Sequence, residues 1–277
     1  MYVCIPAGLV KPTRDWKNLG PCLKVIQHTK EGGKYNRMAV NSEGLLAVTD
    51  STNKRVHLLT KEGALVRSIG KGMFSGNFCG VAFDLKGNVW VIDQGQNRNN
   101  KILKLSQDGR LLQDICQLVK DGHFKNPCGM SVSPDGLIYI CDCSNLGVTV
   151  HDEEGKYQFR FALHTFASGV TFGSDGLVYV ITSNWNVSIW SKEGAFKRDF
   201  KTKYAPTCIA ATNDNHLVIT SFNSNAIMVY TLDGQMVHEF TRESSNPWMF
   251  NGLLGLCVDD AGLVYVGDTT NRCVQMF

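Results

Sequence analysis

The sequence lacks any apolar run near the roughly 18 residues that a membrane-spanning helix needs, so we expect no membrane span. The first ten residues are apolar, but no basic region precedes them and Lys11 follows at once, which argues against a signal peptide. The composition, with 43% hydrophobic and 19% charged residues among 277, is typical of a soluble globular protein. Collagen-like and disordered chains are excluded.

Paired cysteine spacings are also missing. There are ten cysteines but no CxxC pair, and Cys141 and Cys143 form only a CxC. We expect Cys141, Cys208, Cys257 and Cys273 to lie in strands of the core, where a free cysteine behaves as a small hydrophobe. Without a framework of pairs, a reducing, intracellular compartment is favoured, and we expect a cytoplasmic location.

What the sequence has instead is a repeat. A short apolar strand precedes a Gly or Asn turn six times, at intervals of 39 to 49 residues, at Gly44, Gly87, Gly136, Gly176, Asn215 and Gly262. Two further β-rich strands follow each turn, and in five copies another glycine turn leads to a fourth strand. Alternation of period two with glycine turns predicts antiparallel hairpins and no helix. Four strands in each repeat of this length are typical of a β-propeller.

The sixth copy ends at Phe277 after its third strand. The segment CLKVIQH (22–28) resembles the missing fourth strand, and pairing it there would cover an exposed sheet edge. The sequence therefore predicts an all-β, six-bladed propeller over residues 22–277, closed by its N-terminal strand. Residues 1–21 are expected to be a linker or an N-terminal extension.

The loop after the second strand of each repeat carries a motif. DSTNKRV (50–56) and DTTNRCV (268–274) share the form Asp-x-x-Asn-x-x-Val; DCSNLGV (142–148) is close, DQGQNRNNKI (93–102) is longer, and SNWNV and SFNSNAI are degenerate. These loops resemble NHL repeats, and the chain is most similar to the C-terminal propellers of TRIM-NHL and related proteins. We expect Asp50, Asp93, Asp142 and Asp268 to be turn-formers, since Asx side chains bond their own backbone two residues on.

The loops predict a disc with two unlike faces. In an antiparallel blade, the loops between the second and third strands share a face with the blade-to-blade loops. That face holds 13 Lys or Arg and seven acids, whereas the opposite face holds three Lys and 14 acids. Asp-Gly turns explain part of the acidity, but they do not explain the bases.

The basic loops also contain ten aromatic residues: Tyr35, Phe74, Phe78, Phe124, Phe166, Trp185, Tyr204, Phe222, Trp248 and Phe250. We expect about half of them to fill the spaces between blades. The others, among the bases, would suit stacking on unpaired bases while cations hold the phosphates. The residues predicted to bind RNA are Lys34, Tyr35, Arg37, Lys54, Phe74, Arg98, His123, Phe124, Lys125, Phe166, Trp185, Lys203, Tyr204, Phe222, Trp248 and Arg272.

Arg37 stands where four of the other five copies have glycine, so it is expected to border the central channel. It would either bind RNA or close the ring by bonding blade-edge carbonyls, and the sequence favours neither. Reversing the charges of Arg37, Arg98 and Lys125 is expected to abolish RNA binding without lowering the melting temperature.

Three functions compete. The resemblance implies binding of single-stranded RNA, often uridine-rich and in mRNA 3′ untranslated regions, with repression of the transcript. The same face could bind a peptide or a protein co-repressor, with Trp185, Trp248 and Phe250 as anchors. Some NHL-like propellers instead bind Ca or Zn and act as lyases or lactonases. Here the innermost strands lack ligand residues and the seven histidines are scattered, so we expect no enzyme, metal or cofactor. A parent of the TRIM type would carry its RING module elsewhere, and we expect the isolated domain to be monomeric.

Overall fold

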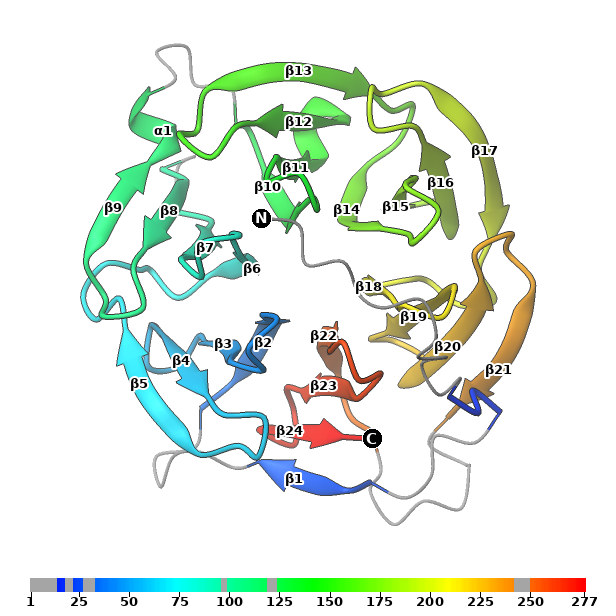
Figure 1. Ribbon diagram of the computed structural model, residues 1–277, viewed down its shortest axis with the longest axis horizontal. Helices are drawn as coiled ribbons and strands as arrows, with labels where there is room; N and C mark the ends of the chain where they lie inside the picture. Colours follow the sequence, from blue (N-terminus) through cyan, green and yellow to red (C-terminus); the bar gives the residue numbers. More distant parts are fainter. Residues whose placement is uncertain (1–13, 18–21, 27–32, 96–98, 119–123, 242–249) are drawn as a thin grey trace, which may run out of the picture.

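The computed structural model describes residues 14–17, 22–26, 33–95, 99–118, 124–241 and 250–277. Within them, six four-stranded antiparallel sheets are arranged as blades around a common axis (Figure 1). Blade 1 consists of β2 (Tyr35–Val40), β3 (Leu46–Asp50), β4 (Arg55–Leu59) and β5 (Leu65–Ile69). Blade 2 consists of β6 (Phe78–Phe83), β7 (Val89–Asp93), β8 (Lys101–Leu105) and β9 (Leu111–Asp114). Blade 3 consists of β10 (Pro127–Val132), β11 (Ile138–Asp142), β12 (Gly147–His151) and β13 (Tyr157–Ala162).

The remaining blades repeat this order. Blade 4 consists of β14 (Ala167–Phe172), β15 (Val178–Thr182), β16 (Asn186–Trp190) and β17 (Phe196–Lys201). Blade 5 consists of β18 (Cys208–Ala211), β19 (His216–Ser221), β20 (Ala226–Thr231) and β21 (Met236–Phe240). Blade 6 consists of β22 (Leu253–Val258), β23 (Val264–Asp268), β24 (Cys273–Met276) and β1 (Lys24–Ile26). The predicted six-bladed, all-β propeller is confirmed.

The predicted closure is also confirmed. Strand β1 pairs antiparallel with β24, with Lys24 opposite Met276 and Ile26 opposite Val274. The N-terminal strand thus completes the last blade and covers its edge. Figure 1 shows β1 and β24 side by side at the rim, next to the C-terminus.

The core lies between the blades. The second strand of every blade is almost entirely buried, whereas the fourth strand exposes many of its residues. Six clusters of buried apolar side chains fill the interfaces between neighbouring blades. Each blade therefore buries both faces of its inner strands against its neighbours, which explains why these strands contain continuous apolar runs.

Two short helical segments interrupt the β structure, contrary to the expectation of none. Helix α1 (Ile115–Leu118) is one turn after β9, and the 3-10 segment η2 (Cys143–Asn145) lies in the loop of blade 3. Asp142 caps η2 by accepting the N–H of Asn145. No helix in the described part of the chain is long and apolar enough to cross a membrane.

Residues Arg14–Lys17, within the segment expected to be a linker, pack against the propeller. The ring of Trp16 is 3% exposed and belongs to the apolar cluster between blades 5 and 6. Its Nε1 donates to Asp214 at 2.7 Å, and the guanidinium of Arg14 donates to the carbonyl of Gly262. The sequence pattern gave no sign of this contact.

Candidate functional site

The hydrogen bonds of the loops define the two faces of the disc. The N–H groups of Ser51, Gln94 and Cys143 donate to carbonyls of Lys34, Asn77 and Asn126, so the loops after the second strands contact the blade-to-blade loops. We call the surface formed by these two sets of loops the basic face. The surface formed by the turns between first and second strands and between third and fourth strands is the acidic face.

The four aspartates of the repeat motif are buried structural groups, as predicted. Asp50, Asp93, Asp142 and Asp268 end the second strands of their blades and are at most 1% exposed. Asp142, for example, accepts N–H bonds from Lys125 and Asn126 of the incoming loop and from Asn145 of its own loop. These carboxylates fix the loops of the basic face and do not reach its surface.

The described cations of this face are mostly exposed. Lys34, Lys54, Lys71, Lys125, Lys201, Lys203 and Arg272 are exposed, and Arg37 and Lys101 are half-buried. Lys203 pairs with Glu239 at 2.5 Å. Since the four described acids of these loops are buried, the basic face presents positive charge to solvent. Arg98 lies outside the described residues, as do His123 and Trp248.

Three of the predicted RNA-binding rings are in the core, so their assignment to an exposed stacking surface is wrong. Tyr35, Phe74 and Phe124 are only 2%, 6% and 7% exposed. Phe74 packs edge-on against Phe78, and Phe124 lies beside His151 between blades 2 and 3. Their loops lead into inner strands, where an aromatic ring gains more from filling the space between blades than from exposure to water. Phe78 and Phe250 are buried too, so the expectation that about half of the ten rings are core is confirmed.

The rings that remain accessible are on blades 4 and 5. Phe166, Trp185 and Phe222 are 54%, 51% and 41% exposed, and Tyr204 is half-buried. The Nζ of Lys203 lies 5.3 Å from the centre of the Tyr204 ring, in a cation–π contact. Trp185 has a left-handed backbone, with φ of 60°, which is unusual for a bulky residue. We refer to Phe166, Trp185, Tyr204 and Phe222 as the aromatic patch.

Arg37 bridges blades across the central axis. Its Nε donates to the carbonyl of Cys79 in blade 2 at 2.9 Å, and its Nη1 donates to the carbonyl of Leu254 in blade 6. Four of the other five innermost strands carry glycine here, and at Gly129 the space is small: a Cβ would lie 2.5 Å from the carbonyl oxygen of Ser168. The structure therefore supports the ring-closing role of Arg37.

One cysteine pair is present, contrary to expectation. Cys128 and Cys143 form a disulfide that ties the start of β10 to η2 on the basic face. The sequence gave no CxxC spacing because the two cysteines meet through the fold of blade 3 and lie 15 residues apart. One pair is not a framework of disulfides, so the reducing compartment and the cytoplasmic location both stay predictions. Cys141, Cys257 and Cys273 are buried free cysteines as expected, and Cys208 is half-buried.

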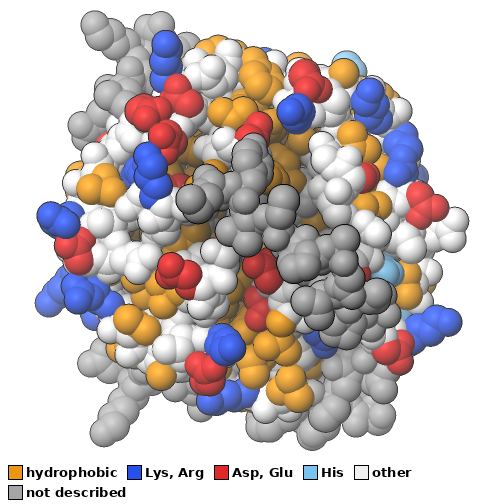
Figure 2. Space-filling view, viewed as in Figure 1, with side chains coloured by type: hydrophobic (Ala, Val, Ile, Leu, Met, Phe, Trp, Pro, Cys, Tyr) orange, Lys and Arg blue, Asp and Glu red, His pale blue; other side chains and the backbone are white. Residues whose placement is uncertain are grey.

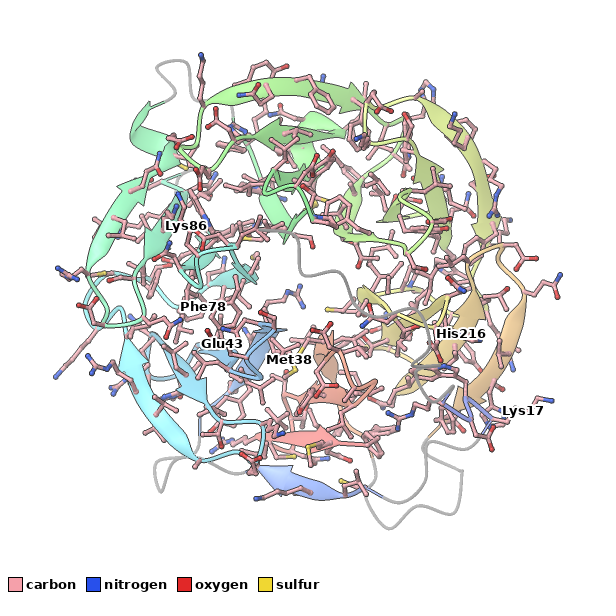
Figure 3. All side chains as sticks on the ribbon, viewed as in Figure 1. Lys17, Met38, Glu43, Phe78, Lys86 and His216 are labelled. Atoms are coloured by element: carbon pink, nitrogen blue, oxygen red, sulfur yellow. A yellow bond between two sulfur atoms is a disulfide. The ribbon has the colours of Figure 1, made fainter. Side chains whose placement is uncertain are left out.

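The acidic face has the composition predicted from its turns. All 14 of its acids and all three of its lysines are among the described residues. Figure 2, viewed from this side, shows acidic side chains on the turns of several blades. Glu43 and Lys86, labelled in Figure 3, belong to neighbouring turns, and Lys86 pairs with Glu153 at 2.6 Å. Lys17 and His216 in the same figure mark where the N-terminal segment meets blade 5.

Metal-ligating side chains are not gathered anywhere in the described residues: no group of three or more His, Cys, Asp or Glu could hold an ion there. The innermost strands, which line the central channel, contribute mainly apolar residues such as Met38, Val81 and Met130.

Comparisons with known proteins agree with this architecture. A family model described as NHL repeat matches residues 250–277, which include strands β22, β23 and β24 of blade 6. "Protein brain tumor" of Drosophila melanogaster is 22% identical over 134 residues, a match covering 44% of this chain and 13% of that protein. This chain thus matches only a small part of its curated relative.

Solved structures with the same fold include enzymes and a binding protein. A gluconolactonase from Xanthomonas campestris superposes with a TM-score of 0.71 and 16% identity, covering 88% of this chain and 85% of that one. Virginiamycin B lyase from Staphylococcus aureus gives 0.66 and 16%, covering 92% and 87%. A chain of a nidogen/laminin complex gives 0.68 and 16%, covering 81% and 84%. At such low identity these similarities show the fold alone.

Six blades and closure by the N-terminal strand define a six-bladed β-propeller. The Asp-x-x-Asn loops of blades 1, 3 and 6, their buried aspartates and the family match over residues 250–277 support an NHL-repeat propeller.

Proposed function

We propose that this propeller binds single-stranded RNA on its basic face and thereby acts in post-transcriptional repression of mRNA. The observation that carries the proposal is the combination of exposed cations and exposed rings on one face, while the described acids of that face are buried. Phosphates need the cations, and unpaired bases need flat side chains on which to stack. The opposite, acidic face would repel a polyanion.

The weak similarity to a TRIM-NHL-type protein supports the same proposal. RNA sequence preference would arise where base edges meet loop side chains beside the stacking rings. Uridine-rich segments are the first candidates to test, because the family resemblance implies them.

The second candidate is binding of a peptide or a protein co-repressor on the same face. It is favoured by the exposure of Trp185 and Phe222, since exposed aromatic rings are common anchors of protein interfaces. Peptide binding through buried rings depends little on salt, whereas RNA binding falls steeply as counterions are restored.

The test is a titration of labelled oligo-U, oligo-A and a hairpin duplex, each at 50 and 200 mM salt, followed by fluorescence anisotropy. We expect saturable binding of unpaired RNA, weakened by about tenfold or more at the higher salt. A variant with four exposed lysines reversed to glutamate should bind at least tenfold more weakly: Lys34, Lys54, Lys125 and Lys201.

The matched control reverses two exposed lysines of the acidic face, Lys61→Glu and Lys192→Glu. We expect it to bind RNA as the wild type does. Equal losses in both variants, or affinity independent of salt, would refute RNA binding on the basic face.

A further inference from the structure

The last residue of the second strand divides the blades into two groups. It is aspartate in blades 1, 2, 3 and 6, but Thr182 in blade 4 and Ser221 in blade 5. All six side chains are buried. The substitution therefore changes the charge beneath the loops of the basic face without changing the place of the residue.

In blades 2, 3 and 6, the carboxylate holds the incoming loop. Asp93 accepts N–H bonds from Ser75 and Asn77, at 2.6 and 2.9 Å. The residue before this anchored stretch is Phe74, which is buried. Phe124 precedes Lys125, whose N–H donates to Asp142, and Phe250 precedes Asn251, whose N–H donates to Asp268. Each anchored loop thus places its aromatic ring in the core.

Blades 4 and 5 lack this anchor. Thr182 Oγ1 donates to the carbonyl of Asn186 within its own loop. The hydroxyl of Ser221 and that of its neighbour Thr220 are buried without a hydrogen-bond partner among the described residues. Phe166, whose carbonyl accepts the N–H of Ser183, stands where the anchored blades have Asn77 and Asn126. This position is exposed at Asn77 and half-buried at Asn126, and the ring of Phe166 is exposed there too. Leu163, three residues earlier, takes the buried place of Phe74.

The same division appears in the aromatic rings. Among the residues that the structure describes, the rings of the loops leading into blades 1, 2, 3 and 6 are buried: Tyr35, Phe74, Phe78, Phe124 and Phe250. The exposed or half-buried rings of the aromatic patch all belong to the loops of blades 4 and 5. Within the described part of the chain, the exposed rings of the basic-face loops are thus found on the two blades that lack the carboxylate.

The buried charge beneath the basic-face loops also differs between the two groups of blades. A buried carboxylate lowers the potential above each anchored blade, whereas blades 4 and 5 have none at that position. Lys201 and Lys203 are exposed at the end of β17 and just beyond it, between these two blades. An anion approaching the basic face there meets Lys201 and also Lys203, which is paired with Glu239.

The backbone conformation of Trp185 also indicates a functional role for blade 4. Lys54, Leu146, Asn225 and Arg272 share its left-handed backbone before the third strand, so the turn itself demands this conformation. Asparagine fits it with little strain, but tryptophan does not. A large ring kept in an unfavourable conformation, half exposed to water, indicates a role outside the fold.

We propose that the ligand site of the basic face is restricted to blades 4 and 5. There the aromatic patch stacks on the bases of a short unpaired RNA segment, and Lys201 and Lys203 neutralise its phosphates. The anchored blades 1, 2, 3 and 6 form the rigid support. This inference rests on the proposed function and narrows it to one sector of the ring.

The experiment compares two double variants of the full chain with the oligo-U probe. Trp185→Asn with Phe222→Ser removes two exposed rings, and asparagine suits the left-handed turn, so the melting temperature should not fall. We expect RNA affinity to drop at least about tenfold, since each stacked ring contributes substantially. Thr52→Ala with Lys71→Ala removes two exposed side chains from the basic-face loops of blades 1 and 2, and should change affinity by less than about threefold.

A third variant restores the aspartate anchor in blade 5. Ser221→Asp with Ser224→Asn recreates the Asp-x-x-Asn spacing of the other blades. We expect weaker RNA binding with an unchanged or higher melting temperature, whereas a variant that simply misfolds would melt earlier. Circular dichroism on all three variants separates the two cases.

The outcomes distinguish the two proposals. If the wild type does not bind RNA, both the proposed function and this inference fall. If the wild type binds but the Thr52/Lys71 variant loses affinity while the Trp185/Phe222 variant keeps it, RNA binding stands and the restriction to blades 4 and 5 is overturned.

Discussion

The Nε2 atom of His57 lies 3.1 Å from Oδ2 of Asp50, and both side chains are buried in blade 1. The other ring nitrogen of His57 lies 2.8 Å from the hydroxyl of Ser68 on β5. His57 thus connects Asp50, which bonds the basic-face loop, to β5, the outer strand of the same blade. The corresponding partner of Asp268 is the neutral Gln275, at 2.9 Å.

This difference predicts that the contributions of Asp50 and Asp268 to the stability of the fold change with pH in opposite directions. Burial by itself raises the pKa of Asp50, but hydrogen bonds from His57 and Asn53 outweigh it and leave the pKa below its ordinary value. The carboxylate therefore stabilises the fold above the unfolded pKa of about 4, and this contribution is lost as the pH falls through the folded pKa. Asp50→Asn should destabilise the protein at pH 7, and its deficit should shrink below about pH 4.

Asp268→Asn is the control. Burial raises the pKa of Asp268 despite its hydrogen bonds from Asn271 and Asn251. The contribution of Asp268 is therefore greatest below the unfolded pKa and declines as the pH rises through the folded value. Relative to the wild type, Asp268→Asn should gain stability as the pH rises, the opposite trend. Urea unfolding midpoints between pH 3 and pH 7 test this, and parallel trends would contradict it.

Arg37 should matter for stability, which corrects the expectation that reversing its charge leaves the melting temperature unchanged. Its guanidinium bonds the carbonyls of Cys79 and Leu254, which belong to blades 2 and 6 on either side of blade 1. We expect Arg37→Ala to lower the free energy of unfolding by about 2 kcal/mol or more, because charged hydrogen bonds are lost and the carbonyls lose a donor. Thermal denaturation measures this, with the exposed Lys34→Ala as control. Equal melting temperatures would assign Arg37 to the ligand instead.

Trp16 should be needed for full stability of the propeller. Its ring fills the interface between blades 5 and 6, and its Nε1–H bonds Asp214. We expect Trp16→Ala to cost about 3 to 5 kcal/mol, the usual range for removing a buried aromatic ring. Lys17→Ala, at an exposed neighbour, should have no effect on the guanidinium chloride midpoint. A small effect of Trp16→Ala would mean that the N-terminal segment detaches freely in solution.

The disulfide should make stability depend on reducing agent. Cys128 and Cys143 close a loop with a sequence separation of 15, and such a cross-link is worth about 3 kcal/mol through the entropy of the unfolded chain. Dithiothreitol should therefore lower the unfolding midpoint of the wild type. The Cys128→Ser/Cys143→Ser variant should have the lower unfolding midpoint even without reductant, and dithiothreitol should not change it. A wild type that ignores reductant would show that the bridge does not form.

The propeller could be predicted from the sequence because its signals are local. Turns such as Gly44 and Gly136 recur with the strands that they join, and the alternation along each strand is set within a few residues. Even the closure by residues 22–28 follows from counting strands. The buried aspartates were predictable too, since an Asx side chain caps the loop in which it lies.

The candidate site was predicted only in part. Phe74 and Phe166 both lie in loops that lead into an inner strand, yet Phe74 is buried and Phe166 is exposed. They occupy different places in these loops, because Phe166 aligns with Asn77, three residues after Phe74. The backbone hydrogen bonds of the folded loops were needed to see this alignment.

The sequence by itself determined the number of blades, the order of strands and the polarity of the two faces, because each depends on residues close together in the chain. Only the tertiary structure decided which rings face water, that Arg37 spans three blades, that Trp16 packs between blades 5 and 6 and that Cys128 meets Cys143. Those contacts join different blades or different strands of one blade, and their energies depend on the space left between the elements once they have packed.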